Sequence, residues 1–183
     1  MNRPRIHIIG GPGSGKSFVA AELSHRLGVP AYDLDDLFWD RSASRYGVRS
    51  DAAERDRRLA AIVAQDSWII EGVYYGWLAP SFEAADMILE LTPSLWVRHW
   101  RVIRRFVLRK LGRRASKHES LADLWRLLRW SHTYDRRHLA AARQSISACG
   151  RQLVACTTSE QVFAATSSFS LQRSAPRVAR YRR

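Results

Sequence analysis

A glycine-rich segment near the start of the chain has the residue types and the spacing that phosphate binding requires. It reads Gly10-Gly11-Pro12-Gly13-Ser14-Gly15-Lys16-Ser17 and follows the pattern G-x-x-x-x-G-K-[S/T]. Glycines allow successive backbone N–H groups to point into one anion-sized cavity. In this pattern the lysine reaches the β- and γ-phosphates of a nucleotide, and the hydroxyl of Ser17 ligates Mg²⁺. We therefore expect these eight residues to bind a nucleotide and its magnesium ion. The guanine-reading sequence N-K-x-D does not occur in the chain, so ATP is the expected nucleotide.

Carboxylates follow two predicted strands at the points where nucleotide-bound Mg²⁺ takes its protein partners. Glu71 ends the apolar run Trp68-Ile69-Ile70, and Asp35 follows the run that ends at Leu34. The carboxyl ends of parallel strands meet beside the phosphate loop. We expect Ser17 and Glu71 to position the metal and Asp35 to orient the acceptor hydroxyl. Solvated loop charges are the alternative, and the other candidate acids are Asp33, Asp36 and, less favoured, Glu90.

Short apolar runs alternate with helical patterns along the chain, as in a parallel sheet with helices on both faces. The predicted strands are residues 5–9, 30–34, 67–72, 86–91 and 152–156. The predicted helices are residues 16–27, 51–65, 93–111, about 134–148 and 160–165. Ser120 and Asp123 have capping-box spacing before a further helical segment. The phosphate loop joins the first strand to the first helix, which is the context its motif needs.

The long predicted helix at residues 93–111 has an apolar face and a basic face. The apolar face holds Trp96, Trp100, Ile103, Val107 and Leu111, and the basic face holds Arg98, Arg101, Arg105 and Arg109. Residues 98 to 117 include nine Arg or Lys and no acid, and the part from Arg113 to Lys117 is expected to form a loop. Three interpretations remain open: a lid that neutralises phosphates, a surface that contacts nucleic-acid phosphates, and a solvated helix face.

Three aromatic residues beyond this helix have two interpretations. Trp125, Trp130 and Tyr134 lie at helical spacing, which favours a place in the core, and they could instead stack on nucleic-acid bases.

Several of these motifs together resemble a known family. The phosphate loop, Leu34-Asp35-x-Leu37-Phe38-Trp39, Trp68-Ile69-Ile70-Glu71-Gly72-x-Tyr74, Ala85-Asp86 and Trp96-Val97-x-x-Trp100-Arg101 resemble the bacterial adenylate-kinase-related proteins called DNA topology modulation proteins. The resemblance covers residues 5 to 130. It implies a three-layer P-loop NTPase fold, like that of nucleoside monophosphate kinases, with a five-stranded parallel sheet of order 2-3-1-4-5.

The same resemblance implies roles for three residues. Glu71 takes the place of the Asp in the D-G-F-P-R segment of adenylate-type kinases. Arg101 and Arg105 take the places of two lid arginines that lie near adenine and the transferring phosphoryl group. The chain departs from the kinase pattern because Glu71-Gly72-Val73-Tyr74-Tyr75 lacks the Pro and the substrate-binding Arg, and because the lid has no zinc-ligand cysteines. These departures argue against adenylate kinase itself and leave the acceptor open.

The composition predicts a basic cytoplasmic protein of one domain. Thirty Lys and Arg against 17 Asp and Glu give a net charge of +13, which favours polyanionic partners. We expect a kinase-like domain at residues 1–166, with a basic helical lid at about 109–133, and a disordered tail at 167–183. Cys149 and Cys156 have neither disulfide nor metal spacing. No leader or membrane-spanning segment is expected, and oligomeric state is open.

The catalytic set expected from the sequence is Lys16, Arg101, Arg105 and Asp35, with ATP and Mg²⁺ as cofactors. The expected function is transfer of the ATP γ-phosphate to an unidentified small-molecule acceptor. The alternative is an ATP-binding protein, or weak ATPase, that acts on DNA through its basic surface.

Overall fold

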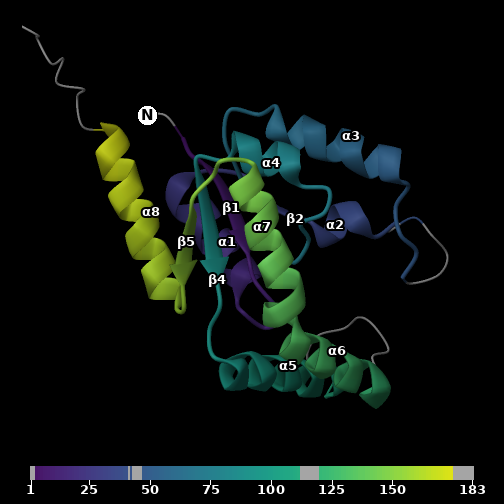
Figure 1. The fold of residues 1–183 in the computed structure, drawn as a ribbon. Helices are drawn as coiled ribbons and strands as arrows, with labels where there is room; N and C mark the ends of the chain where they lie inside the picture. The colour runs from purple at the N-terminus through teal and green to yellow at the C-terminus, as the bar shows by residue number, and fades with distance from the viewer. Residues whose placement is uncertain (1–2, 41, 43–46, 112–119, 175–183) are drawn as a thin grey trace, which may run out of the picture.

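A five-stranded, fully parallel sheet forms the centre of the molecule. The computed structural model of the chain describes residues 3–40, 42, 47–111 and 120–174. The strands are β1 (Arg5–Ile9), β2 (Ala31–Asp33), β3 (Trp68–Gly72), β4 (Met87–Leu91) and β5 (Leu153–Cys156), in the order β2-β3-β1-β4-β5 (Figure 1). This arrangement confirms the expected α/β fold and strand order. It places β1, which leads into the phosphate loop, between β3 and β4.

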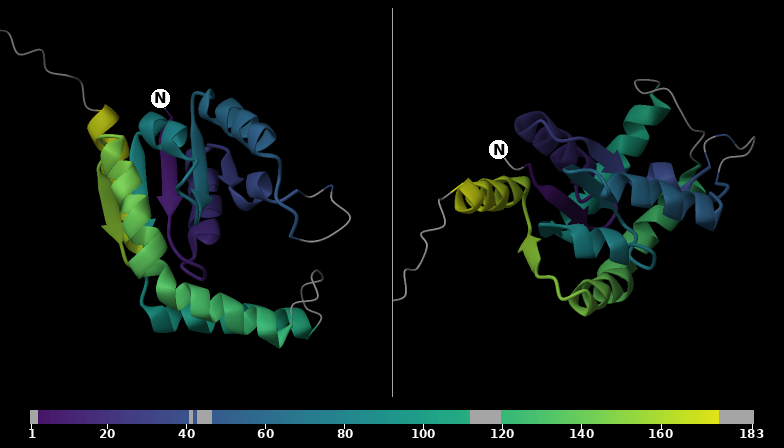
Figure 2. Two further views of the ribbon diagram at one scale, coloured as in Figure 1. Left: turned by 45° about the vertical axis from the view of Figure 1, so that its right-hand side comes forward. Right: turned by 90° about the horizontal axis from the view of Figure 1, so that it is seen from above.

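Helices cover both faces of the sheet, as Figures 1 and 2 show. One face packs against α1 (Lys16–Leu27) and α8 (Ser159–Ser174), and the other against α3 (Ala52–Val63), α4 (Ala79–Ala84) and α7 (Ala140–Ala148). Because both faces are covered, the central strands are continuous apolar runs. In β3, Trp68 and Ile70 join the core on the α7 side, and Ile69 joins the core on the α1 side. Burying each such side chain contributes about 2 kcal/mol.

Two antiparallel helices project across the carboxyl ends of the strands. They are α5 (Leu95–Lys110) and α6 (Leu121–Tyr134), which contact each other and run together in the left view of Figure 2. The predicted capping box opens α6: the Ser120 hydroxyl accepts from the backbone of Asp123, and the Asp123 carboxylate accepts from the backbone of Ser120. The expected loop from Arg113 to Lys117 lies outside the described residues.

A π-helical segment, η1 (Asp135–Leu139), joins α6 directly to α7. The chain changes direction there, so that α6 runs along the end of the sheet and α7 runs along its face (Figure 2). The sequence predicts a new helix starting at Tyr134, but in the structure one helical run continues from 121 to 148. This π-helical segment lies where α6 joins α7.

The last helix is longer than the sequence predicts. The expected helix ended at 165 with disorder from 167, but α8 runs to Ser174. Phe163 and Phe169 pack against the core on the α1 side, and Arg26 lies 4.3 Å from the centre of the Phe163 ring. The hydroxyl of Ser167 donates to the Phe163 carbonyl at 2.9 Å, so this serine is compatible with the helix. Residues 175–183 of the expected tail lie outside the described residues.

The sequence also missed two short helices, α2 (Asp35–Phe38) and α4. Among the described residues, no helix is both long enough and apolar enough to cross a bilayer.

Candidate active site

The phosphate loop follows β1 and ends at the first turn of α1. Gly13 and Gly15 have φ angles of 74° and 97°, which favour glycine. The loop also packs tightly on α5. A Cβ atom on Gly11 would lie 2.5 Å from a guanidinium nitrogen of Arg98, and one on Gly13 would lie 2.4 Å from the Arg98 carbonyl oxygen. Gly11 and Gly13 stand at positions where the motif allows any residue, so the close packing on α5, rather than the motif, favours glycine at these two positions.

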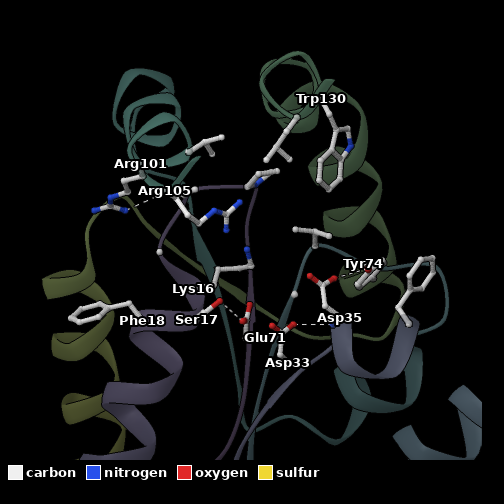
Figure 3. Close-up of a pocket in the computed structure, with 18 of the residues that line it drawn as sticks. Lys16, Ser17, Phe18, Asp33, Asp35, Glu71, Tyr74, Arg101, Arg105 and Trp130 are labelled. Carbon is white, nitrogen blue, oxygen red and sulfur yellow. Dashed lines mark hydrogen bonds between the residues drawn. The ribbon is translucent and has the colours of Figure 1, made fainter. Parts of the chain in front are cut away.

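Lys16 lies inside the loop with only 7% of its surface exposed. Its Nζ donates to the carbonyl of Gly11 at 3.3 Å. Burial lowers the pKa of Lys16, and the carboxylates of Glu71 and Asp33 are the main influences in the opposite direction. The side chain points into the pocket of Figure 3, where it can meet a polyphosphate.

Ser17 and Glu71, the two residues expected to position the metal, contact each other directly. The Ser17 hydroxyl donates to Oε1 of Glu71 at 2.5 Å, and Glu71 is buried (Figure 3). A hydroxyl and a carboxylate are oxygen ligands of the kind that Mg²⁺ takes. No group of three or more His, Cys, Asp or Glu in the described part of the chain is arranged to hold a metal alone. A Mg²⁺ ion here would need phosphate and water oxygens for its other ligands.

Two aspartates at the end of β2 complete the acidic side of the site. Burial and the nearby Glu71 carboxylate raise the pKa of Asp33 to about 6. Its Oδ1 accepts from the backbone N–H of Asp35 at 2.9 Å. Asp35 is exposed to the pocket and accepts from the Tyr74 hydroxyl at 2.7 Å. Burial, followed by this hydrogen bond, raises the pKa of Tyr74. Asp36 is not among the described residues that line the pocket.

Glu90, the less favoured metal candidate, lies on the other face of the sheet. Side chains alternate along a strand, and Glu90 shares its face with Ile88, which packs on the α7 side. Arg143 of α7 donates to its two carboxylate oxygens at 2.6 and 2.8 Å. The structure therefore separates Glu90 from the phosphate loop.

The four arginines grouped on α5 do not form one exposed face. Arg101 lines the pocket and donates to the Ser14 carbonyl at 2.7 Å, and Arg105 also lines the pocket. Arg98 is instead 1% exposed and forms two hydrogen bonds, of 2.9 and 2.5 Å, with Asp135 of η1. Arg109 is not among the described lining residues. The expectation of one basic face is thus wrong for Arg98.

The apolar face of α5 points outward. Trp96, Trp100 and Leu111 are 85%, 65% and 66% exposed, and the side buried against the loop and α6 carries Arg98, Val102 and Phe106. Helical periodicity separates two faces but does not say which one faces the domain. In this structure the side of α5 that carries Arg98 and Arg101 faces the domain, because it contacts the phosphate loop.

The three aromatic residues of α6 have different surroundings. Tyr134 is fully buried, as a core residue should be, and its hydroxyl donates to the Val73 carbonyl at 3.2 Å. Trp130 is partly buried and lines the pocket. Trp125 is 70% exposed, so a place in the core is wrong for this residue.

The pocket around the phosphate loop has a volume of about 650 Å³. Phe18 and Arg101 lie on one side of Lys16, and Asp35, Tyr74 and Trp130 lie on the other (Figure 3). The pocket is also lined by Phe18, Phe38, Arg49 and Tyr74, which were not expected from the sequence, although Phe38 and Tyr74 belong to the motifs that carry the family resemblance.

The strand order, the phosphate loop and the acidic strand ends together define a protein with the fold of the P-loop kinases. Three solved structures share this fold at 14% identity. A shikimate kinase from Acinetobacter baumannii, solved with shikimate, has a TM-score of 0.56 and covers 94% of this chain and 95% of its own. A sugar kinase from Janibacter sp. HTCC2649 has a TM-score of 0.51, with coverage of 92% and 94%. An uncharacterized protein from Eubacterium ventriosum has a TM-score of 0.54, with coverage of 93% and 100%.

Sequence similarity to known proteins covers less of the chain than the structural similarity does. No family model matches the chain. The uncharacterized protein YqaC of Bacillus subtilis (strain 168) is 30% identical over 76 residues. This match spans 41% of each protein, about two fifths of the length of the curated relative.

Proposed function

We propose that this protein binds Mg·ATP in its phosphate loop and transfers the γ-phosphate to the hydroxyl of a small molecule. The observation that carries the proposal is the 2.5 Å contact of Ser17 with Glu71 beside the buried Lys16. A phosphate loop with an acidic partner at the neighbouring strand end is the arrangement that holds a nucleotide and its metal. Asp35 faces the same pocket from a third element.

The lining residues suit the separate tasks of phosphoryl transfer. The amides of the loop and Lys16 would bind the phosphates, while Ser17 and Glu71 would hold Mg²⁺, which neutralises phosphate charge when bound. Arg101 and Arg105 line the pocket from α5 and would stabilise the charge that develops on the transferring group. Asp35 would accept the proton of the acceptor hydroxyl as its oxygen forms a bond to the γ-phosphorus and the bond to the ADP oxygen breaks.

Two further observations support a kinase. The solved structures that share the fold include a shikimate kinase and a sugar kinase. The motifs that resemble the adenylate-kinase-related topology modulation proteins, from Leu34 to Trp39 and from Trp68 to Tyr74, also contribute residues to the lining of the pocket. We include the chain in that group as part of this proposal.

A coupled assay of ADP release tests the proposal. The purified protein with Mg·ATP would be screened against nucleosides, nucleotides, sugars and hydroxy acids, with Lys16→Ala as the inactive control. Acceptor-dependent ADP release by the wild-type protein alone supports a kinase. Equal release with and without every acceptor indicates an ATPase and contradicts the proposal.

A nucleic-acid-associated ATP-binding protein is the second candidate, and the outward face of α5 favours it. Trp96 and Trp100 are exposed there, and the exposed Arg104 follows Trp100 by one turn. Exposed aromatic rings beside cationic groups can stack on bases and contact phosphates. Under this candidate Trp100→Leu weakens binding to single-stranded DNA, and Arg104→Ala reduces the salt slope by about one unit. Titration of labelled DNA at several salt concentrations measures both effects.

A further inference from the structure

One side of the pocket is walled by aromatic side chains from three separate segments. Phe38 and Tyr74 stack with ring centres 4.4 Å apart, and Trp39 meets Phe38 edge-on at 4.8 Å. Trp130 lines the same pocket from α6. All four rings are partly exposed, so they offer apolar surface to a bound molecule. Stacking and apolar contact are therefore the main interactions that this side can provide.

Asp35 adds a polar group within this aromatic wall. The Tyr74 hydroxyl donates to one of its oxygens at 2.7 Å, which fixes the orientation of the carboxylate. The side chain is exposed to the pocket, and its carboxylate points toward the region of Lys16 (Figure 3). An ionised carboxylate only accepts hydrogen bonds, so its natural ligand is a hydroxyl or another donor.

The charges on this side are unfavourable to an anionic ligand. Asp33 and Asp35 line the pocket, whereas Glu71 lies beside Ser17, and Lys16, Arg101 and Arg105 line the pocket around the phosphate loop. Arg49 is the positively charged residue on the aromatic side, among the residues that the structure describes. Its side chain is exposed, and its guanidinium carbon lies 5.4 Å from the centre of the Phe38 ring. A carboxylate or phosphate ligand is usually held by bidentate arginine contacts. The described residues of this side offer no buried arginine for that task.

From this arrangement we infer that the acceptor is an uncharged, hydroxyl-bearing ring compound, with the chemistry shared by neutral sugars and nucleosides. Its ring packs against Phe38, Tyr74 and Trp130, and one hydroxyl donates to Asp35. This inference rests on the proposed kinase function. The hydroxyl proton passes to Asp35 as the oxygen bonds to the γ-phosphorus, and ADP leaves with the electron pair of the broken bond. The product is a phosphate monoester of the ring compound.

Matched pairs of acceptors that differ in charge test the inference. Each nucleoside is compared with its 5′-monophosphate, glucose with gluconate, and methyl shikimate with shikimate, in the coupled ADP assay. We expect the neutral member of at least one pair to have a kcat/KM about tenfold or more above that of its anionic partner. Comparing the nucleoside pairs with the sugar pair shows whether the acceptor is a nucleoside or a sugar. Preference for the anionic member in every active pair overturns the inference while leaving the kinase intact.

Binding without turnover separates this inference from the proposed function. Calorimetry with the protein saturated by a non-hydrolysable ATP analogue measures the affinity for each compound. If neutral ring compounds bind but no compound of the panel is phosphorylated, the ligand class is supported and the proposed kinase function is contradicted. If the protein binds the analogue but no neutral compound of the panel binds or reacts, the acceptor class is wrong.

Two tryptophans of α6 provide a matched pair of variants. Trp130 lines the pocket, and Trp125 is exposed and is not among the described lining residues. We expect Trp130→Leu to raise the KM for the neutral acceptor about fivefold to tenfold with little change in kcat, and Trp130→Phe to restore most of the affinity. Trp125→Leu should leave KM unchanged. The melting temperatures of all three variants show whether each is folded. If folded Trp130→Leu has the same KM for the neutral acceptor as the wild type, the aromatic wall does not bind the acceptor.

Discussion

The hydroxyl of Ser17 lies 2.5 Å from Oε1 of Glu71, although the two residues are 54 positions apart in the chain. The register of the sheet explains this contact. Glu71 pairs with Ile8 of β1, and its side chain is on the face covered by α1, whose first turn contains Ser17. Strand order and side-chain alternation therefore bring a hydroxyl and a carboxylate together beside the phosphate loop.

We predict that Glu71→Gln reduces the affinity for Mg²⁺ and the Mg²⁺-dependent turnover about tenfold to a hundredfold. The amide fills the same space but carries no charge to balance the metal. ATP affinity without metal should change much less. Steady-state kinetics across a Mg²⁺ titration measures the effect. A larger loss of Mg²⁺ affinity in Asp35→Asn than in Glu71→Gln would reassign the metal site, whereas a loss of turnover alone in Asp35→Asn would not.

The arginines of the pocket should affect turnover more than ground-state binding of ATP. Arg101→Ala and Arg105→Ala should each lower kcat on the order of tenfold to a thousandfold, because charge develops on the transferring group. Arg104→Ala is the control, since this residue belongs to the same helix and is not among the described lining residues. Arg98 cannot serve as a control because its ion pair with Asp135 is part of the packing. Equal kcat values in all three variants would argue against the lid role.

Contact between the phosphate loop and α5 makes Gly13 sensitive to substitution. Gly13→Ala places a Cβ 2.4 Å from the Arg98 carbonyl oxygen at a φ of 74°, so we expect a loss of about 2 kcal/mol or more in the free energy of unfolding. Weaker ATP binding should accompany this loss. Gly76→Ala is the control, because its Cβ would meet nothing within 4 Å, and its effect should stay within about 0.5 kcal/mol. Urea unfolding compares the two variants, and similar losses would contradict the packing argument.

A buried histidine should make stability depend on pH. His7 of β1 is fully buried, with its Nδ1 3.2 Å from the Ser81 hydroxyl, and burial lowers its pKa to about 3. Its pKa in the unfolded chain is about 6.5, so below this pH the unfolded state binds more protons and stability falls. Its contribution is complete above about pH 6.5 and is lost progressively toward about pH 3.

The resulting prediction compares unfolding at about pH 7 and about pH 5. The wild-type protein should lose about 2 kcal/mol more between these conditions than His7→Gln, which has no titrating group at this position. Urea unfolding at both pH values gives the four free energies. An equal pH dependence in the two proteins would show that His7 is protonated in the folded state at about pH 5 and would contradict this prediction.

The spacing of residues within short segments was enough to predict the structural features whose partners lie close together in the sequence. The phosphate loop has a defined pattern over eight residues, and the expected strands are apolar runs because the sheet is covered on both faces. The strand order could not come from these runs and came from the family resemblance. The capping box at Ser120 was also predictable, since both of its partners lie within one turn.

The missed features depend on distant partners. Burial of Arg98 requires Asp135, which lies 37 positions further along the chain. The pairing of Tyr74 with Asp35 joins segments 39 positions apart, and no periodicity within either segment indicates it. The extension of α8 depends on the packing of Phe169 against the core, whereas its local composition resembles a disordered tail.

The fate of the γ-phosphate tests the central claim most directly. Phosphorus NMR of the wild-type protein with Mg·ATP and the acceptor panel follows the γ-phosphorus signal over time, with Lys16→Ala as the matched control. We predict a phosphate monoester signal that grows as ADP appears, with the wild-type protein only. A γ-phosphate that remains in ATP, or that appears only as inorganic phosphate with every acceptor, would contradict it.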